Sequence, residues 1–416
     1  MKKYKVLLCS LKHEKNIGDA IIADSTRYII ESVLKGKEYT IEEIDIAGKK
    51  DYSTRFSVKK SPIYYIRKFF YLGFYGFGRI LRKSHFGNWL EDKSWFFSDE
   101  RKIYNLYYES LIKSNDLMIF TGGGIIKFKY QNFYQYIDYI TLKANKYHRQ
   151  VIINAAGIEG YDDKDAKCRR LKKALNRECV KMITTRDDIS LLERNYIVNK
   201  KIHTERVADS AVFISEATGI SKNDKSEIIG IGLIRSKIFL DNDINFSEED
   251  LLNFYVNLVN KLEQKNIKYK FFTNGMKIDY DFGIRVLEKL GREKDISEYI
   301  FPSPINSEEL VKLISGFRAV IACRLHACIV SYSLDIPAIG IVWNNKLKMF
   351  GEIIGYSKRF RTIDQLDIDD IVEVLIASWD EGYDEAQKKN YRNTVYKSLE
   401  KYLLEDYQKW ECNGNN

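Results

Sequence analysis

Short apolar runs rich in Val and Ile alternate along the chain with segments whose apolar residues recur at helical spacing. In the first half, the apolar runs predict strands at 5–10, 116–124, 151–157 and 182–188, and a short strand or loop at 207–213. The helical patterns between them predict helices at 19–35, 163–180 and 188–195. This order predicts a parallel sheet covered by helices, with right-handed crossovers.

The alternation begins again after the polar stretch 221–226. Strands are predicted at 228–234, 269–275, 319–323 and 337–343, and helices at 247–265, 280–290, 307–316 and 326–334. We therefore expect two α/β domains, an N-terminal one over 1–222 and a C-terminal one over 226–375. A charged helical segment, 376–416, completes the chain, and we expect it to pack back across both domains.

Composition narrows the class of protein. The 416 residues suit two to three domains. Apolar residues make up 45% and charged residues 30%, which excludes a collagen-like, disordered or polytopic membrane protein. The net charge of +9 is small for this length and points to no particular partner. The six cysteines form no CxxC pair and no apolar stretch reaches the ~20 residues of a spanning helix, so we expect free thiols and a cytoplasmic protein.

One segment, 61–98, departs from the rest in composition. It holds thirteen aromatic residues and six Lys or Arg in 38 residues, against two acids. Its uncharged centre, 69–78, has only ten residues, too few to span a bilayer. Aromatic rings beside cations suit a membrane interface facing anionic lipid. The alternative is an insertion that packs its aromatic side chains on the first domain.

The strongest local signal for chemistry is the stretch 321–350. A predicted buried strand ends there, and Arg324, Leu325 and His326 follow at once at the start of a helix. Ligands of open α/β sheets bind at the carboxyl ends of strands, and a helix start attracts anions. An arginine fork favours carboxylate or phosphate, and a histidine exchanges protons near neutral pH. A structural ion pair and a capped histidine would explain the same residues.

Two glycine-containing loops also follow predicted strands. Asn16, Gly18 and Asp19 open the helix 19–35, and Gly122, Gly123 and Gly124 end the strand 116–124. Asn or Asp at a helix start is commonly a cap, and three glycines commonly form a tight turn. At the same edge of one sheet, however, the two loops would line one cleft, where glycine lets a ligand approach the backbone.

Further cations follow predicted strands. Arg186 and Arg235 each stand just after a strand, and Lys346 and Lys348 lie beyond the strand that follows His326. Arg186 and Arg235 each either face the cleft or are ordinary surface charges. The other histidines, at 13, 85, 148 and 203, are scattered and are interpreted as non-catalytic. The chain has no P-loop lysine, GxGxxG, GxSxG or HExxH motif and no ligand cluster, so no metal site is expected.

Seven segments, in this order along the chain, resemble the polysaccharide pyruvyl transferase family. They are NIGDAII (16–22), TGGGI (121–125), NAAGIEG (154–160), TRDDIS (185–190), VADSAVF (207–213), GIGLIR (230–235) and the stretch from CRLHA to KLKMF (323–350). Arg-Leu-His-Ala, with a proline eleven residues after His326 and then a lysine, is the most specific. Residues 48–115 and 380–416 show no matching pattern. Glu159-Gly160 and Asp209-Ser210 replace the family's usual Gly-Pro and Asp-Pro, in loops expected to hold the acceptor.

The resemblance implies two Rossmann-like domains facing each other across a cleft, as in GT-B glycosyltransferases. It implies transfer of pyruvate from phosphoenolpyruvate onto two hydroxyls of a sugar, giving a cyclic ketal, in capsule, exopolysaccharide or cell-wall glycan synthesis. Phosphoenolpyruvate is then the donor substrate, and no cofactor is expected. Acceptors in such pathways are often lipid-linked sugars, which implies work at the inner face of the membrane, with contact through 61–98.

The residues singled out above fit this chemistry. A small donor with a carboxylate and a phosphate needs cations at both ends, for which we select Arg324, Arg235, Arg186 and Lys346, with the helix start at Leu325 assisting. His326 is the candidate acid or base, and Asp19 a second catalytic candidate. We expect the acceptor on the opposite domain, at Asn16, Gly18 and the 122–124 turn.

Two other functions remain open on the sequence alone. A GT-B glycosyltransferase or sugar-nucleotide enzyme would share the fold, but would need an acid for the ribose hydroxyls in the second domain. A non-catalytic scaffold of a glycan assembly complex would use 61–98 as a membrane anchor.

Overall fold

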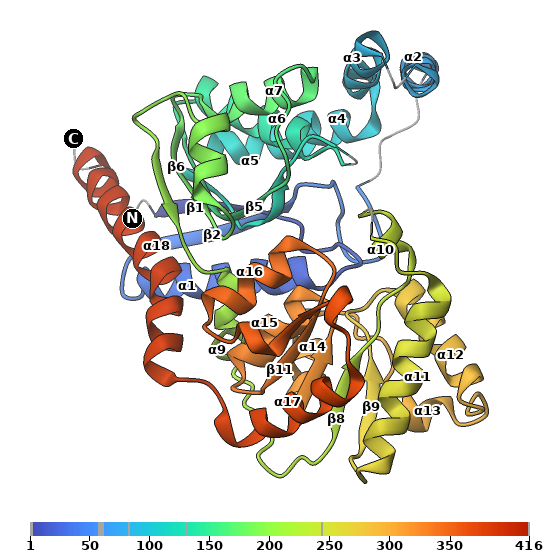
Figure 1. Cartoon of the computed structure of the whole chain (residues 1–416). Coiled ribbons are helices and arrows are strands. Elements are labelled where there is room, and N and C mark those ends of the chain that lie inside the picture. The colour runs from blue at the N-terminus through green and yellow to red at the C-terminus, as the bar shows by residue number, and fades with distance from the viewer. Residues whose placement is uncertain (1–2, 57–61, 82–83, 130, 243, 415–416) are drawn as a thin grey trace. The chain divides into compact units, whose positions relative to one another are not determined.

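The computed structural model describes residues 3–56, 62–81, 84–129, 131–242 and 244–414. The chain forms two compact units. The N-terminal unit contains 1–13, 29–209 and 394–416, and the C-terminal unit contains 14–28 and 210–393. Each unit is a parallel sheet flanked by helices, so the predicted α/β class is confirmed (Figure 1).

The sheet of the N-terminal unit has seven strands in the order β2-β1-β3-β5-β6-β7, with β4 paired to β5. The strands are β1 (Tyr4–Ser10), β2 (Tyr39–Asp45), β3 (Leu117–Phe120), β4 (Gly123–Ile126), β5 (Gln150–Ile158), β6 (Val180–Thr185) and β7 (His203–Arg206). The two edge strands, β2 and β7, are absent from the sequence prediction. Their sequences, YTIEEID and HTER, are polar because an edge strand keeps much of its surface exposed.

The predicted strand 116–124 divides in two at its glycines. Strand β3 ends at Phe120 and β4 begins at Gly123. Gly122 and Gly123 have φ of +110° and +81°, a conformation that favours glycine. The three glycines therefore redirect the chain from β3 into a second strand. At the other place where the sequence left strand or loop open, 207–213, the structure has a 3₁₀ turn over Ser210–Phe213.

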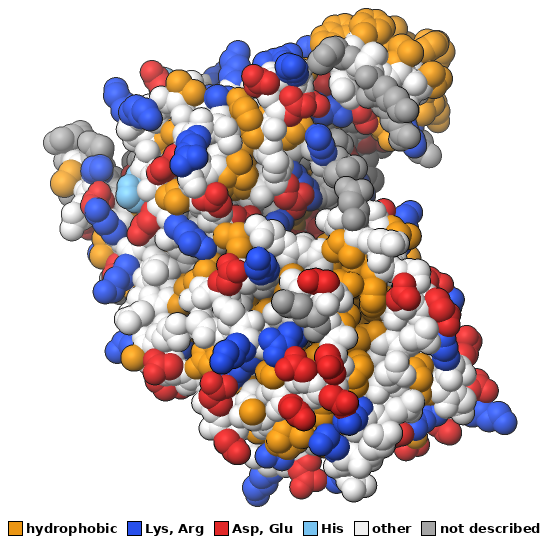
Figure 2. Space-filling view, in the orientation of Figure 1, with side chains coloured by type: hydrophobic (Ala, Val, Ile, Leu, Met, Phe, Trp, Pro, Cys, Tyr) orange, Lys and Arg blue, Asp and Glu red, His pale blue; other side chains and the backbone are white. Residues whose placement is uncertain are grey.

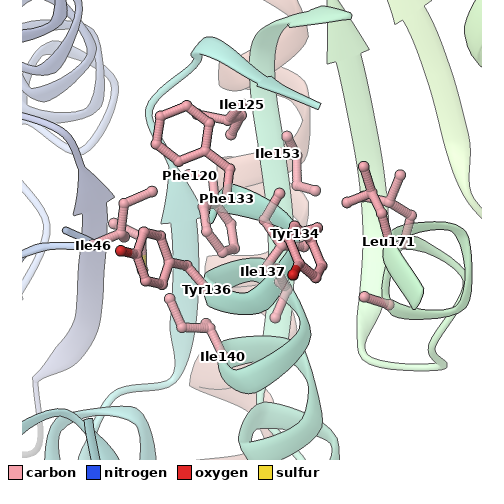
Figure 3. Close-up of a cluster of buried hydrophobic side chains, with 14 of the residues drawn as sticks. Ile46, Phe120, Ile125, Phe133, Tyr134, Tyr136, Ile137, Ile140, Ile153 and Leu171 are labelled. Atoms are coloured by element: carbon pink, nitrogen blue, oxygen red, sulfur yellow. The ribbon is translucent and has the colours of Figure 1, made fainter. Parts of the chain in front are cut away.

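Helices connect the strands of this sheet. They are α2 (Pro62–Ile80), α3 (His85–Ser94), α4 (Asp99–Ile103), α5 (Glu109–Ser114), α6 (Phe133–Lys146), α7 (Ala166–Leu175) and α8 (Ile189–Leu191). Figure 3 shows the core that α6 builds, with Phe133, Ile137 and Ile140 beside Phe120 and Ile153 of the strands. All five side chains are buried, and such burial is the main source of stability for the unit.

The sheet of the C-terminal unit has five strands in the order β12-β11-β10-β8-β9. They are β8 (Ile229–Gly232), β9 (Tyr269–Phe272), β10 (Ala319–Ala322), β11 (Ala338–Val342) and β12 (Phe360–Thr362). The first four correspond to the strands predicted from the apolar runs. Short continuous runs of this kind are typical of strands buried on both faces, which makes them easy to recognise in a sequence.

The helices of this unit are α9 (Ile214–Thr218), α10 (Lys237–Leu240), α11 (Glu248–Gln264), α12 (Lys277–Lys289), α13 (Ile296–Tyr299), α14 (Ser307–Ser315), α15 (Leu325–Ser333), α16 (Asn345–Ile353) and α17 (Ile368–Glu381). The predicted cap of α11 is present, since the Ser247 hydroxyl accepts from the Asp250 backbone and the Asp250 carboxylate accepts from Ser247.

Two helices have residues in both units. Helix α1 (Gly18–Val33) begins in the C-terminal unit and ends in the N-terminal one. Helix α18 (Glu385–Gly414) belongs to the C-terminal unit up to residue 393 and to the N-terminal unit beyond it. In the first part, Lys388 pairs with Asp335. In the second, the Asp406 carboxylate accepts a hydrogen bond from the Tyr4 hydroxyl.

Candidate functional site

The C-terminal unit places two of the predicted cations side by side. Strands β8 and β10 are neighbours. From β8 the chain passes to β9 on one side of β8, and it then crosses to β10 on the other side. Such a point, where the strand order reverses, is where open α/β sheets bind ligands. Arg235 follows β8 and Arg324 follows β10, so the two arginines flank this point at the carboxyl edge of the sheet.

A buried carboxylate holds both arginines. Asp279, in the first turn of α12, is fully buried. It accepts a hydrogen bond from Nε of Arg324 at 3.2 Å and from the backbone N–H of Arg235 at 3.1 Å, and the Arg235 guanidinium lies 4.0 Å away. One carboxylate against two guanidinium groups leaves a net positive charge. The arrangement orients two cations and keeps their charge available for an anion.

The exposures of the two arginines differ. The Arg324 side chain is 11% exposed and that of Arg235 is 25% exposed. Both guanidinium groups also lie near the Met276 sulfur, at 3.3 and 3.7 Å. The two cations thus share one anchoring carboxylate and one apolar contact, which fixes them with respect to each other.

Helix α15 begins directly after Arg324, as the sequence predicted. Arg324 is its capping residue, in extended backbone, and Leu325 and His326 form its first turn. The first N–H groups of a helix have no partner within the helix and carry the positive end of its dipole. The imidazole of His326 is 9% exposed and lies against Gly18, where an added Cβ would be 2.1 Å from Nδ1.

The segment 14–28 belongs to the C-terminal unit, which corrects the expectation that Asn16, Gly18 and Asp19 lie on the opposite domain. The backbone N–H of Ile17 donates to the carbonyl of Asn274 at 3.2 Å, and its side chain packs against Gly275. Further along α1, Asp24 accepts a hydrogen bond from Ser307. These long-range contacts draw the segment away from the sheet that precedes it in sequence.

The loop itself is compact. The Asn16 side chain accepts from the Gly18 backbone at 3.4 Å, and its carbonyl accepts from the Asp19 backbone at 3.3 Å. Asn16 therefore acts as the cap that the sequence suggested as one explanation. Gly18 is buried because His326 covers it, and Asp19 is half-buried.

Two residues of this site escaped the sequence analysis. One is Asp279, which stands just before the predicted helix 280–290. The other is Asn274, at the end of β9, which is 1% exposed and whose side-chain Nδ2 makes no hydrogen bond to the described residues. A buried amide donor without a partner is unfavourable, so its presence at a sheet edge marks a candidate ligand contact. In the sequence, Asn274 is the first residue of an Asn-Gly pair, which is common in turns.

Lys346 stands in the first turn of α16, after β11, the next strand of the sheet. It is half-buried, and the Asn344 side chain caps the helix by accepting from Leu347 at 3.0 Å. The indole N–H of Trp343 donates to the carbonyl of Cys323 at 2.6 Å. The helix carrying Lys346 thus starts at the same edge of the sheet as α15.

The two cysteines on either side of Arg324–His326, Cys323 and Cys328, are buried thiols. Burial raises the pKa of the Cys323 thiol to about 12, and it raises the pKa of Cys328 as well. Both are fully buried and free, as the sequence predicted. Thiols of this kind stay protonated and behave as small apolar side chains.

The remaining predicted site residues lie in the N-terminal unit. Arg186 is 8% exposed and forms a buried ion pair with Asp209. Gly124 is half-buried, and Gly157 and the Asp187 carboxylate lie beside it, the latter accepting from Ile158 at 2.8 Å. In the structure, Arg186 thus forms an ion pair, and the glycines redirect the chain from β3 into β4.

The N-terminal unit also contains a pocket of about 500 Å³ at the carboxyl ends of β1 and β2. Polar and charged side chains line one part of it, including Ser10, Lys12, His13, Glu43 and Lys49, and the rings of Phe56 and Tyr107 another. These two rings pack with centroids 4.9 Å apart. Tyr107 lies in a π-helical turn, Tyr104–Tyr108, a distortion frequent near binding sites.

This pocket is not evident from the sequence, because its residues come from three separate segments. His13, interpreted there as non-catalytic, has a buried Nδ1 without a hydrogen-bond partner among the described residues. Its backbone N–H donates to Asp45 at 2.9 Å, and its carbonyl accepts from Lys49 at 2.9 Å. Within the described part of the chain, no group of three or more His, Cys, Asp or Glu side chains is placed to hold a metal ion.

The two parallel sheets with their helices define a protein of the GT-B type, built from two Rossmann-like domains. Solved structures of that type match nearly the whole chain. A UDP-GlcNAc 2-epimerase from Methanocaldococcus jannaschii has 10% identity and a TM-score of 0.54, covering 97% of this chain and 100% of its own. The S. aureus MnaA–UDP structure has 9% identity and a TM-score of 0.50, covering 99% and 97%.

Within this class, the sequence model of one family matches residues 16–345, from the loop before α1 to the start of α16. The chain belongs to the polysaccharide pyruvyl transferase family. No curated protein matches it. The family match includes Arg235, Asn274, Asp279 and the start of α15 at the edge of the C-terminal sheet, and it ends one residue before Lys346.

Proposed function

We propose that this protein transfers pyruvate from phosphoenolpyruvate onto two hydroxyls of a glycan sugar and forms a cyclic ketal. The observation that carries the proposal is the pair Arg235 and Arg324, held on the buried Asp279 beside the helix start that bears His326. A small donor with two anionic ends requires closely spaced, oriented cations.

The donor contacts follow from the same edge of the sheet. In this proposal Arg324 and Arg235 bind one anionic group of phosphoenolpyruvate, and Lys346 with the N–H groups around Leu325 binds the other. The buried Nδ2 of Asn274 supplies a further donor. Arg186 lies in the N-terminal unit, where Asp209 pairs with it, and the proposed donor site does not depend on it.

The reaction needs one proton delivered and two removed. His326 protonates the terminal CH₂ carbon of phosphoenolpyruvate, which makes C2 electrophilic. One acceptor hydroxyl attacks C2 and loses its proton, and the C2–O bond to phosphate breaks, with the cations stabilising the departing phosphate. The second hydroxyl attacks C2 and loses its proton, which closes the ketal ring. Asp19, in the first turn of α1, is the proposed second acid or base. General acid–base groups of this kind contribute ~10²–10⁴-fold to the rate.

The acceptor part of the proposal rests on two regions. Asn16 and Gly18 pack close to His326, so an acceptor bound there has its hydroxyls near the proposed acid. In the N-terminal unit, the pocket at the ends of β1 and β2, with its carboxylate, lysines and aromatic rings, is a separate candidate for saccharide binding. Gly122, Gly123 and Gly124 are retained as acceptor contacts. We propose a lipid-linked acceptor, modified at the inner face of the membrane in capsule, exopolysaccharide or cell-wall glycan synthesis.

The test is incubation of the protein with phosphoenolpyruvate and candidate glycans. Phosphate release that needs both substrates, with a glycan mass gain of one pyruvate less one water, is the expected result. Arg324→Lys keeps the charge but loses the fork and should weaken donor binding, and His326→Gln should remove turnover while leaving donor binding intact. Stabilisation of the fold by a UDP-sugar, and not by phosphoenolpyruvate, would favour a nucleotide-sugar enzyme instead. Full turnover by His326→Gln would refute the role given to that residue.

A further inference from the structure

The N-terminal unit carries a pair of helices, α2 and α3, with an unusually apolar surface. Of the twenty large apolar side chains that are exposed among the described residues, twelve lie between positions 63 and 96. Figure 2 shows these side chains gathered over α2, which Figure 1 locates. Large exposed apolar patches on a protein mark interaction surfaces, because single exposed side chains are otherwise scattered.

Four of the exposed apolar side chains of α2 share one face of the helix. Ile66, Phe69, Phe77 and Ile80 follow the three- and four-residue spacing that brings side chains to one side. Their exposed fractions are 58%, 74%, 63% and 78%. Gly73 and Pro62 fall on the same face. The side of α2 that points away from the protein is therefore apolar along its whole length and carries no charge.

The opposite side of α2 provides the contacts that hold the pair together. Gly78 lies against the α3 backbone, where an added Cβ would be 2.7 Å from the Glu91 nitrogen. Gly87 of α3 lies closer still to the residue that follows α2, since an added Cβ would be 2.0 Å from the Leu81 carbonyl oxygen. Phe70 and Phe74 pack on Phe97, with centroids 5.5 and 5.6 Å apart. The two helices thus meet through glycines, and the rings of Phe70 and Phe74 join α2 to the turn that follows α3.

The charged residues of α2 are all cations. Helix α2 contains Arg67, Lys68 and Arg79 and no acidic residue. Arg67 donates to the carbonyl of Ser98 at 3.2 Å, while Arg79 lies over the ring of Tyr75. Lys93 of α3 lies over the rings of Trp89 and Phe96.

The acids of α3 are paired to other parts of the unit. Glu91 binds Lys167, and Asp92 binds Arg170, each at 2.6 Å. Lys68 has Asp99 at 3.9 Å. The charge that remains beside the apolar face is therefore positive, which complements an anionic surface.

No helix in the described residues is long and apolar enough to cross a membrane. An apolar face bordered by cations and aromatic rings instead suits a helix lying in the plane of the interface. We propose that α2 and α3 dock the N-terminal unit on an anionic lipid surface, with Ile66, Phe69, Phe77 and Ile80 below the headgroups and Lys68, Arg79 and Lys93 among them. This inference deepens the proposed function by naming the residues that contact the lipid. It rests on the proposed lipid-linked acceptor only for the reason why the protein would bind a membrane. Its test needs no turnover.

The test is vesicle co-sedimentation of the full chain. Vesicles of phosphatidylcholine are compared with vesicles containing phosphatidylglycerol, at low and high salt. The wild type should bind the anionic vesicles, and the triple variant Phe69→Ser, Phe77→Ser, Ile80→Ser should bind at least about tenfold more weakly. The variant Lys68→Gln, Arg79→Gln should lose the preference for anionic vesicles and the dependence on salt.

The matched control is Leu142→Ser, Val198→Ser, Leu240→Ser, which removes three apolar side chains exposed by 46%, 63% and 59% elsewhere. It should bind vesicles like the wild type. Equal loss in the control, or no binding by the wild type, would refute the proposal. A dimer in light scattering that the Phe69, Phe77, Ile80 variant dissociates would show instead that a second copy covers this face.

The two proposals fail separately. If phosphate release with a water-soluble glycan is intact in the triple variant while vesicle binding is lost, the surface acts in docking alone. If the wild type binds vesicles and releases no phosphate with any acceptor, the docking surface stands and the proposed reaction is wrong. A single variant, Phe69→Ser, repeats the vesicle measurement should the triple variant fold poorly.

Discussion

Gly18 and His326, more than three hundred positions apart in the sequence, are in direct contact. The imidazole lies on the glycine backbone so closely that a Cβ at position 18 would be 2.1 Å from Nδ1. The contact joins the first loop of the chain to the start of α15, and both belong to the C-terminal unit. The loop that opens α1 thereby determines the position of the ring proposed to transfer the proton.

Gly18→Ala should displace this ring. The methyl group cannot fit without moving either the loop or the imidazole, and a shift of about 1 Å at a catalytic group can cost ~10²-fold. We expect kcat/KM to fall by that order. Gly73→Ala is the control, because a Cβ there meets nothing within 4 Å. Wild-type rates in Gly18→Ala would mean that the position of His326 does not matter for turnover.

Asp279→Asn should release the two arginines. It removes a fully buried negative charge that holds Arg235 and Arg324, and breaking a buried pair costs about 3–5 kcal/mol of stability. We expect that loss in urea unfolding and a rise of about tenfold or more in KM for phosphoenolpyruvate.

The control for this change lies on the same helix. Asp281→Asn removes an exposed partner of Lys277 in an i,i+4 pair and should change stability by less than about 1 kcal/mol. An unchanged KM in an Asp279→Asn protein that still folds would remove the arginine pair from the donor site.

Asn274→Ala separates binding from stability. The buried Nδ2 makes no hydrogen bond to the described residues, so its removal should cost the free protein less than about 1 kcal/mol. If the group contacts the donor, thermal stabilisation by phosphoenolpyruvate should fall markedly. Retention of the full shift would assign the amide a different role.

Tyr107→Ala tests the pocket of the N-terminal unit. The ring packs on Phe56 and is 39% exposed, so it offers an apolar surface to a sugar ring. We expect KM for the glycan to rise about tenfold while KM for phosphoenolpyruvate stays constant. A change in the donor KM alone would contradict a saccharide role for this pocket.

Glu109→Gln should destabilise the protein in a pH-dependent way. Hydrogen bonds from Lys143 and Tyr147 lower the pKa of the Glu109 carboxyl from 4.5 to about 2. Because the folded pKa is the lower one, this stabilisation is complete above about pH 4.5 and is lost as the pH falls toward 2. Because Glu109 is partly exposed, we expect the substitution to lower the free energy of unfolding by about 1–2 kcal/mol at pH 7.

Urea unfolding of the two proteins at pH 7, 5 and 3.5 checks this. The difference in unfolding free energy between the two proteins should be equal at pH 7 and pH 5 and smaller at pH 3.5. Glu293→Gln, at an exposed position, serves as the control and should show no such difference. A constant difference down to pH 3.5 would mean that the ionised carboxylate is not the source of the stabilisation.

The sequence by itself determined the repeating strands and helices, the two parallel sheets, and the start of α15 after Arg324. These features depend on local patterns, since apolar runs, periodicity and caps act within a few residues. It also predicted Arg235, Arg324 and His326 as candidate site residues, because each follows a recognisable strand. The polar edge strands β2 and β7 gave no such pattern and were missed.

Only the tertiary structure decided which residues meet. Asp279 and Asn274 look ordinary in the sequence, and they matter because the folding of the sheet brings α12 and the end of β9 to the two arginines. The segment 14–28 follows the first strand of one sheet, yet its contacts with Asn274, Ser307 and His326 assign it to the other. Hydrophobic periodicity specifies elements one at a time, whereas such pairings depend on packing between residues hundreds of positions apart.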